Sequence, residues 1–459
     1  MHAVRKYLAA WAEPEAALAG AVDGGYSRCL VVPACRERAS LLDGYLRAAA
    51  TSSGRTLCVL VVNGRDGEVA ACTENAALLA ELRATLAGVR AVPRSPESGV
   101  SAFVGATAES ALDVLVVDRA SGGAQFPKKA GVGLARKIGV DVALALRVAG
   151  KVESALVFCT DADVTLPERH FERPELAPGS RRTSSAAGAA VFPFWHEPSS
   201  DEAITRATAL YELSLRYYVA GLAAAGSPYA FHTLGSAMAV DCEAYAAVRG
   251  APNREAGEDF YLLAKIAKVK PLVRTDLPMI RIQSRASDRT PFGTGAYVAR
   301  GVAGGERLFY APETFAALGR FLRSLDAASS DGSADRFLDA RGGLRADEWD
   351  AVARTLFGPK GRASFVAAAL HATSSDARRV RLHDWFDAFR TLKFVHALRD
   401  SVWRDVPFRD ALSRAPFAPF AQGANEASLD ANRVAFMDQE AGTKARFGSS
   451  ALSPDTASP

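Results

Sequence analysis

Two aspartates separated by one residue follow an apolar run, a spacing that is typical of a metal site. Residues 155–160 are mostly apolar, Asp161 and Asp163 come next, and Pro167 closes the segment. The run is short and ends in turn residues, so it predicts a buried strand rather than a helix. Strand side chains alternate, so both carboxylates would point to the same side if the extended geometry continued. Such a site suits Mn²⁺ or Mg²⁺, which bind carboxylates and substrate phosphates. The alternative is a loop whose aspartates only form a turn.

The order of strands and helices predicts where these acids lie. We expect buried strands at 29–33, 57–62, 112–118 and 155–159, and helices at 41–50, 73–87 and 132–148. This alternation predicts an α/β fold with a mostly parallel sheet flanked by helices. Ligands of such sheets bind beyond the carboxyl ends of the strands. Glu37, Asn63, Asp118 and Asp161 all lie at or just past such ends, which indicates one common site.

Composition narrows the class of protein. The chain has 459 residues, of which 49% are hydrophobic, enough for a large core in two or three folding units. The net charge of +4 is spread along the chain and gives no reason to expect nucleic acid as a partner. The 6 cysteines form no C-x-x-C pair, which favours a reducing, cytoplasmic compartment. Glu13, Pro14 and Glu15 interrupt any signal-peptide apolar region.

Four segments together resemble family 2 glycosyltransferases of the GT-A fold. The segment 33–37 (PACRE) is similar to the family's P-x-x-N-E opening, and 129–139 (KAGVGLARKIG) to its G-x-x-x-A-R-N-x-G helix start. Asp161-Ala162-Asp163 stands where the family has its metal-binding D-x-D, and 258–262 (EDFYL) matches its E-D-x-x-L segment. The chain departs from the family at Lys137, where an Asn is usual, and at Asn63, where an acid usually reads the base. No later histidine stands in the usual place of a third metal ligand.

The resemblance implies roles for these residues. It implies that Asp161 and Asp163 bind Mn²⁺ or Mg²⁺, that Asp259 is the catalytic base, and that Glu258 orients it or binds the acceptor. The residues expected to bind the nucleotide sugar are Pro33, Glu37, Asn63, Lys129, Arg136, Asp161, Arg285 and Arg289. Arg285 and Arg289 lie in a glycine-containing loop that would clamp a diphosphate, because guanidinium groups match phosphate geometry. A solvated connection is the alternative for this loop, and an acidic first helical turn is the alternative for Glu258 and Asp259.

The expected function is that of an inverting, metal-assisted glycosyltransferase. It would move a sugar from a nucleotide-diphosphate sugar donor to an unknown hydroxyl acceptor. A nucleotidyltransferase shares the strand–helix order and an acid pair, but it usually has a glycine-rich basic loop after the first strand. A non-catalytic nucleotide-sugar-binding protein on the same scaffold is the other alternative. A P-loop or Rossmann enzyme is disfavoured because neither glycine motif follows the first strand.

The chain divides by composition into five expected regions. These are an N-terminal helix (1–27), a nucleotide-sugar-binding half (28–165), an acceptor-binding half (166–325), a C-terminal helical region (326–420) and a disordered tail (421–459). The helical region would begin with a Ser-, Asp-, Ala- and Gly-rich linker at 326–345. The tail is poor in apolar residues and should be dispensable for the core.

One helix in the C-terminal region combines apolar and basic residues. Within 378–399, apolar residues recur at three- and four-residue steps, and arginines and lysines occupy the remaining positions. This pattern is typical of a helix that lies on a membrane surface, which predicts peripheral membrane contact. The same pattern is more often found in a helix whose apolar stripe packs against the rest of its own protein.

Overall fold

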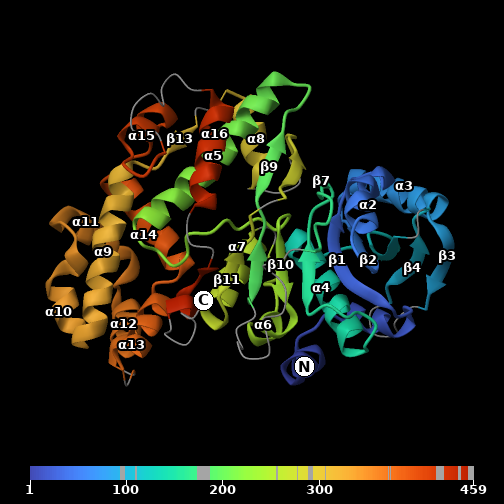
Figure 1. Cartoon of the computed structure of the whole chain (residues 1–459), viewed down its shortest axis with the longest axis horizontal. Helices are drawn as coiled ribbons and strands as arrows, with labels where there is room; N and C mark the ends of the chain where they lie inside the picture. The colour runs from blue at the N-terminus through green and yellow to red at the C-terminus, as the bar shows by residue number, and fades with distance from the viewer. Residues whose placement is uncertain are drawn as a thin grey trace. The chain divides into compact units, whose positions relative to one another are not determined.

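The computed structural model describes residues 1–93, 99–108, 111–172, 187–254, 257–276, 278–287, 293–304, 307–370, 372, 374–419, 428–442 and 446–452. These residues form two compact units (Figure 1). The first unit comprises the described residues of Met1–Glu197, Thr233–Gln283 and Thr290–Gly293. The second comprises those of Pro198–His232, Ser284–Arg289 and Thr294–Pro459.

A mixed sheet forms the centre of the first unit, and its middle strands are those expected from the sequence. They are β1 (Tyr26–Ala34), β2 (Arg55–Asn63), β5 (Leu112–Arg119) and β6 (Leu156–Cys159). They pair in parallel in the order β6-β1-β2-β5. Almost every residue of β1, β2 and β5 is buried, because helices cover both faces of a parallel sheet. The coarse prediction of an α/β fold with a large, partly parallel sheet is confirmed.

Antiparallel strands flank this parallel centre. On one side, β4 (Ser101–Ala106) and β3 (Ala87–Val92) pair antiparallel beyond β5. On the other side, β10 (Met238–Asp241) is antiparallel to both β6 and β8 (Ala189–Val191), and β11 (Leu272–Arg274) is parallel to β8. A separate small sheet has the order β7-β12-β9. Its strands are β7 (Val164–Thr165), β12 (Ile280–Gln283) and β9 (Phe194–Glu197).

The helices of the first unit include α4, which packs on β1 and β2 and carries part of the candidate site. The helices are α1 (His2–Ala10), α2 (Asp43–Ala50), α3 (Val69–Thr85), α4 (Val132–Val148), α6 (Cys242–Ala247) and α7 (Glu258–Val269), with 3-10 turns η1 (Pro14–Ala21) and η2 (Ala39–Leu42). The bounds of α4 agree with the predicted helix. The N-terminal region is a short helix and a 3-10 turn rather than one helix.

The second unit is mostly helical and has an aromatic core. Its helices are α5 (Glu202–Ala224), α8 (Thr294–Val302), α9 (Pro312–Asp331), α10 (Ala334–Asp339), α11 (Ala346–Leu356), α12 (Pro359–Leu370), α13 (Ser375–Trp385), α14 (Ala388–Ser401), α15 (Phe408–Arg414) and α16 (Leu429–Ala441). The shorter elements are β13 (Leu308–Phe309), β14 (Val406–Pro407), β15 (Arg446–Phe447), η4 (Arg341–Gly343) and η5 (Ser449–Leu452). Phe321 is fully buried, and its ring centroid lies 4.7 Å from that of Phe386 and 5.1 Å from that of Phe394.

The prediction of a linker at 326–345 is wrong. Helix α9 continues to Asp331, and α10 and η4 occupy most of the remainder. The small residues that suggested a linker are packed instead, since Ala328 and Ser329 are buried against the core of the second unit. Small side chains let a helix approach its neighbours closely. A composition rich in small residues is therefore found in closely packed helices as well as in linkers.

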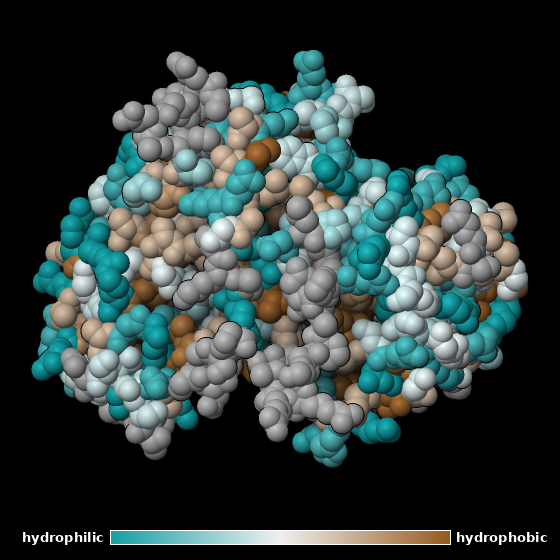
Figure 2. Space-filling view, viewed as in Figure 1, coloured by the Kyte–Doolittle hydropathy of each residue, from teal (hydrophilic) through white to brown (hydrophobic). Residues whose placement is uncertain are grey.

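The prediction of a single helix at 378–399 is also wrong, because α13 and α14 are separated at Phe386 and Asp387. Leu382, Trp385 and Leu398 of the apolar stripe belong to the buried core, which confirms that this stripe packs on its own protein. Membrane contact through the remaining basic residues stays a prediction. Within the described ranges, no helix has the length and apolar character needed to cross a membrane. On the face shown in Figure 2, hydrophilic and hydrophobic residues are interleaved.

The prediction that the tail is disordered from residue 421 is wrong for its described part. Residues 429–441 form α16, which packs against α5, and Phe436 of α16 is fully buried. The segment lacks apolar periodicity, and charged residues hold it in place.

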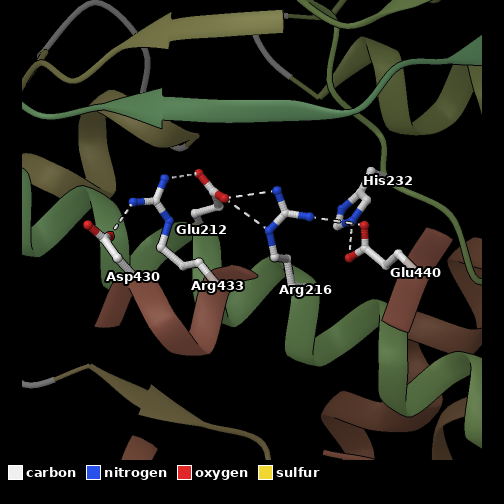
Figure 3. A network of polar contacts seen from close by, with 6 residues as sticks. All are labelled: Glu212, Arg216, His232, Asp430, Arg433 and Glu440. Atoms are coloured by element: carbon white, nitrogen blue, oxygen red, sulfur yellow. Dashed lines mark hydrogen bonds and ion pairs between the residues drawn. The ribbon is translucent and has the colours of Figure 1, made fainter. Parts of the chain in front are cut away.

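A buried ionic network joins α5 to α16 (Figure 3). Glu212 accepts hydrogen bonds from Arg216 Nε at 2.9 Å and from Arg433 Nη2 at 2.6 Å. Arg216 Nη1 donates to Glu440 at 3.0 Å, and Glu440 lies 2.9 Å from His232 Nε2. The side chains of Glu212 and Arg216 are 0% and 1% exposed. Each buried charge therefore has an opposite charge beside it, as burial of ions requires.

Candidate functional site

A buried arginine brings together acids from separate parts of the first unit. Arg136 lies in the second turn of α4 and its side chain is only 2% exposed. Its Nη2 donates to Asp161 Oδ1 at 2.9 Å, and its Nε lies 3.5 Å from Glu258 Oε1. Asp161 follows the end of β6, whereas Glu258 opens α7. One cation thus connects the carboxyl end of a central strand to the start of a helix more than ninety residues later in the chain.

Asp259 is held beside this arginine by backbone amides. Its Oδ2 accepts from the amide of Gly235 at 2.7 Å, and its Oδ1 accepts from the amide of Phe260 at 2.7 Å. A Cβ at position 235 would lie less than 3.0 Å from Arg136 Nη2. Position 235 must therefore be a glycine if the arginine and Asp259 are to keep these positions. Both carboxylate oxygens of Asp259 are fixed, so its orientation is set before any ligand arrives.

Burial perturbs the proton affinity of both acids at the start of α7. Burial raises the pKa of Glu258 to about 7, although the positive charge of Arg136 opposes the shift and Asp259 adds to it. Burial likewise raises the pKa of Asp259, while Arg136 and the backbone amides oppose the rise. The pair is a candidate for proton transfer, because strongly perturbed pKa values cluster at functional sites.

The segment between Asp161 and Asp163 is not extended, so the expectation based on strand alternation is wrong. Strand β6 ends at Cys159, and residues 162 and 163 form a turn before β7 begins. The Asp161 carbonyl accepts from Tyr45 Oη at 2.8 Å, and the Asp163 carbonyl accepts from the Gln283 amide at 2.9 Å. Backbone contacts therefore position both aspartates.

The two aspartates are the expected metal ligands, and their chemistry fits a hard cation. Among the described residues, no group of three or more His, Cys, Asp or Glu side chains has a metal-binding arrangement. The Asp161 side chain is 37% exposed, and one of its oxygens already accepts from Arg136. A cation held by Asp161 and Asp163 would therefore take most of its ligands from water and a substrate's phosphates, as Mg²⁺ does.

The remaining predicted residues have other surroundings. Pro33 is buried in β1 opposite Val61, and Lys129 is exposed just before α4. The Asn63 side chain donates to the carbonyls of Ala34 and Val61, at 3.0 and 3.2 Å. Its amide thus ties the ends of β1 and β2 together.

The last three predicted residues belong to other segments of the chain. Glu37 is half-buried in the segment after β1. Arg285 belongs to the second unit, and Arg289 lies outside the described residues. The structure therefore brings together Arg136, Asp161, Glu258 and Asp259 from the predicted set.

The sequence reasoning missed residues that shape the site without charged side chains. Gly235 and Tyr45 are two of them, and neither is among the predicted site residues. Gly133 is the third such residue, because a Cβ there would lie 2.6 Å from the Arg254 carbonyl oxygen and 3.1 Å from Glu258 Cβ. The available signal was the glycine in each of the segments 129–139 and 234–240, which marks a close approach of chains.

The unusual Lys137 has a structural explanation. It points away from the cluster, toward the N-terminal elements, where its Nζ donates to Asp141 at 2.7 Å and to the Trp11 carbonyl at 2.8 Å. Tyr7 Oη donates to the other oxygen of Asp141 at 2.7 Å. Lys137 thus fastens the N-terminal segment to α4.

Comparisons with known proteins found no matching protein family and no similar curated protein.

Proposed function

We propose that this protein is an inverting glycosyltransferase of the GT-A type. It would transfer a sugar from a nucleotide-diphosphate donor to an acceptor hydroxyl. The observation that carries this proposal is the Arg136 cluster, in which a partly exposed strand-end aspartate and the buried Glu258 pair with one arginine and the half-buried Asp259 lies beside it. The position of the cluster supports it, because ligands of α/β sheets bind beyond the carboxyl ends of the parallel strands.

The donor side of the proposed site is the exposed end of β6. Asp161 and Asp163 would hold a divalent cation, and that cation would supply charge neutralisation for the leaving diphosphate. Arg136 fixes Asp161 in place through the hydrogen bond to Oδ1. Lys129, exposed just before α4, would add a positive charge for a phosphate.

The acceptor side is the pair of acids at the start of α7. Asp259 would take the proton of the acceptor hydroxyl while that oxygen attacks the sugar carbon opposite the leaving diphosphate. This single displacement inverts the configuration at that carbon. The raised pKa of Asp259 makes it a stronger base, and the positive charge of Arg136 beside it opposes part of that rise.

The proposal extends to the compartment and the partners of the protein. All of its cysteines are free, and Cys29, Cys58, Cys159 and Cys242 are buried. Free thiols in the interior favour a reducing environment, so we place the protein in the cytoplasm. Its partners would be the nucleotide sugar and a hydroxyl acceptor.

A binding screen tests the class of donor. Nucleotide-diphosphate sugars are added to the full chain with and without Mn²⁺, and the melting temperature is recorded. A true donor must raise it, since a ligand that binds only the folded state stabilises that state. A Mn²⁺-dependent rise for at least one donor supports the proposal, and no rise with any donor contradicts it.

Two activity assays separate the proposal from its alternatives. Slow hydrolysis of the stabilising donor, with release of a nucleoside diphosphate, supports a transferase. Release of pyrophosphate from a nucleoside triphosphate and a sugar phosphate would identify a nucleotidyltransferase instead. Donor binding with neither reaction, in the presence of a broad set of hydroxyl acceptors, would identify a non-catalytic binder.

A further inference from the structure

A basic groove lies in the second unit, apart from the residues of the proposed transfer reaction. The ends of α11, α12 and α14 form it, and its volume is about 620 Å³. Four cationic side chains line it, together with Thr355 and a single acid, Asp387. The cations are Arg354, Lys360, Arg390 and Lys393.

A tight turn between α11 and α12 gives the groove its shape. Helix α11 ends at Leu356 and α12 begins at Pro359. A Cβ at Gly361 would lie less than 3.0 Å from the Leu356 carbonyl, so this turn depends on a glycine. The first backbone amides of a helix have no partner within the helix and carry partial positive charge. The start of α12 therefore adds to the positive potential of the groove.

Most of the positive charge in the groove is uncompensated. Among the described residues, Arg354, Lys360 and Lys393 have no ion-pair partner. Asp387 caps α14, and its Oδ1 accepts from the Arg390 amide at 3.0 Å. Exposed cations usually have acids nearby on a protein surface, so a concave surface with four cations and one acid favours an anion.

Two of the cations are held by contacts that leave their charge available. Arg390 donates to the Trp385 carbonyl at 2.6 Å and lies 4.9 Å from the centre of the Trp385 ring. Lys393 Nζ lies 4.7 Å from the centre of the Phe389 ring. These contacts are with neutral groups and restrict the side chains, so less entropy is lost when an anion binds.

We propose that this groove binds a phosphate-bearing ligand. Arginine and lysine together suit phosphate, since guanidinium donates paired hydrogen bonds and ammonium provides a point charge. The phosphate would come from a free phosphorylated molecule or from the headgroup of an anionic lipid. The proposal does not depend on the function proposed for the first unit.

The test compares two double variants of the full chain with equal charge change. The groove variant is Arg354→Gln with Lys393→Gln. The control variant is Arg323→Gln with Arg381→Gln, which removes two exposed arginines of the same unit that do not line the groove. Circular dichroism and melting temperature confirm that both variants fold. Their phosphate binding is then compared at low ionic strength, where surface charge is least screened.

Two probes distinguish the sources of phosphate. Pyrophosphate binding is measured by calorimetry, and vesicle binding by sedimentation with phosphatidylcholine alone or with added phosphatidylserine. Any pyrophosphate binding at the proposed donor site would be the same in both variants. A difference in affinity between the two variants therefore comes from the groove. The expected result is a loss of at least about tenfold in affinity for one probe in the groove variant only. Equal binding of both probes by the two variants would overturn the proposal.

Discussion

The amide of Gly235 donates to Asp259 at 2.7 Å, and the absence of a side chain at position 235 leaves the space that Arg136 occupies. One residue thus fixes the orientation of the proposed base and admits the cation that balances it. Position 235 thus has two roles: its amide binds the carboxylate, and its lack of a side chain makes room for the guanidinium.

Gly235→Ala should disrupt the site more than the fold. The new methyl group must push the guanidinium away from Asp161 and Glu258, because it would lie less than 3.0 Å from Arg136 Nη2. We expect a loss of transfer of at least about tenfold, with a loss of stability of about 1–3 kcal/mol from overpacking. Turnover and urea unfolding measure the two effects. Gly20→Ala is the control, since nothing lies within 4 Å of a Cβ there; equal effects in both variants would contradict the prediction.

Asp259→Asn should remove the base and retain the donor site. Asparagine keeps the size of the side chain and an oxygen that can accept from Gly235, but it cannot take a proton. The expected result is a loss of transfer of at least about a hundredfold, the usual contribution of a general base, with donor affinity nearly unchanged. Calorimetry with the donor and acceptor turnover are the two measurements. Unchanged turnover would transfer the role to Glu258, and equal loss of both would indicate a structural role.

The stability of the first unit should fall as the pH rises through the pKa of Glu258. This pKa rises on folding from 4.5 to about 7, so the folded state binds the proton more tightly than the unfolded state. The contribution to stability is therefore complete below pH 4.5 and is lost by about pH 7. Glu258→Gln should flatten the dependence of the unfolding free energy on pH in this window. The exposed Glu202→Gln should leave it unchanged, and an unaltered slope in Glu258→Gln would refute the assignment.

Arg433→Met should destabilise the second unit. It takes the Arg433 guanidinium away from the fully buried Glu212 and removes one link from α5 to α16, while the link between Arg216 and Glu440 remains. Breaking one side of a buried ion pair costs about 3–5 kcal/mol. Thermal and urea unfolding measure the loss, and Asp438→Asn, an exposed change on the same helix, is the control. If both variants unfold alike, the network contributes little to stability.

The parallel centre of the sheet could be predicted because its strands are continuous apolar runs. Strand β3 was missed because almost all of its residues are exposed and it has no such run. The segments around Ala328 and Arg433 were misjudged for a related reason. Composition favoured a linker and a disordered tail, but small side chains pack closely and charged side chains are buried in pairs.

The acidic residues of the candidate site could be predicted from their positions at the ends of a strand and a helix. Asp161 lies at a strand end and Glu258 at a helix start, and topology brings such ends together. The partner of each acid could not be predicted, because pairing depends on which face of α4 turns toward the sheet. Arg136 and Lys137 are neighbours in the sequence, yet Arg136 contacts the acids and Lys137 contacts Asp141.

The ionic network of the second unit has a consequence for synthesis on the ribosome. Arg216 and its partner Glu440 are 224 residues apart in the chain. At about 5–20 residues per second, Arg216 is added to the chain roughly 10–45 s before Glu440. During that interval Glu212 and Arg216, which lie one helical turn apart, have neither Arg433 nor Glu440 beside them. We therefore expect α5 to stay hydrated or chaperone-bound until α16 arrives, so the second unit would complete its folding late in translation.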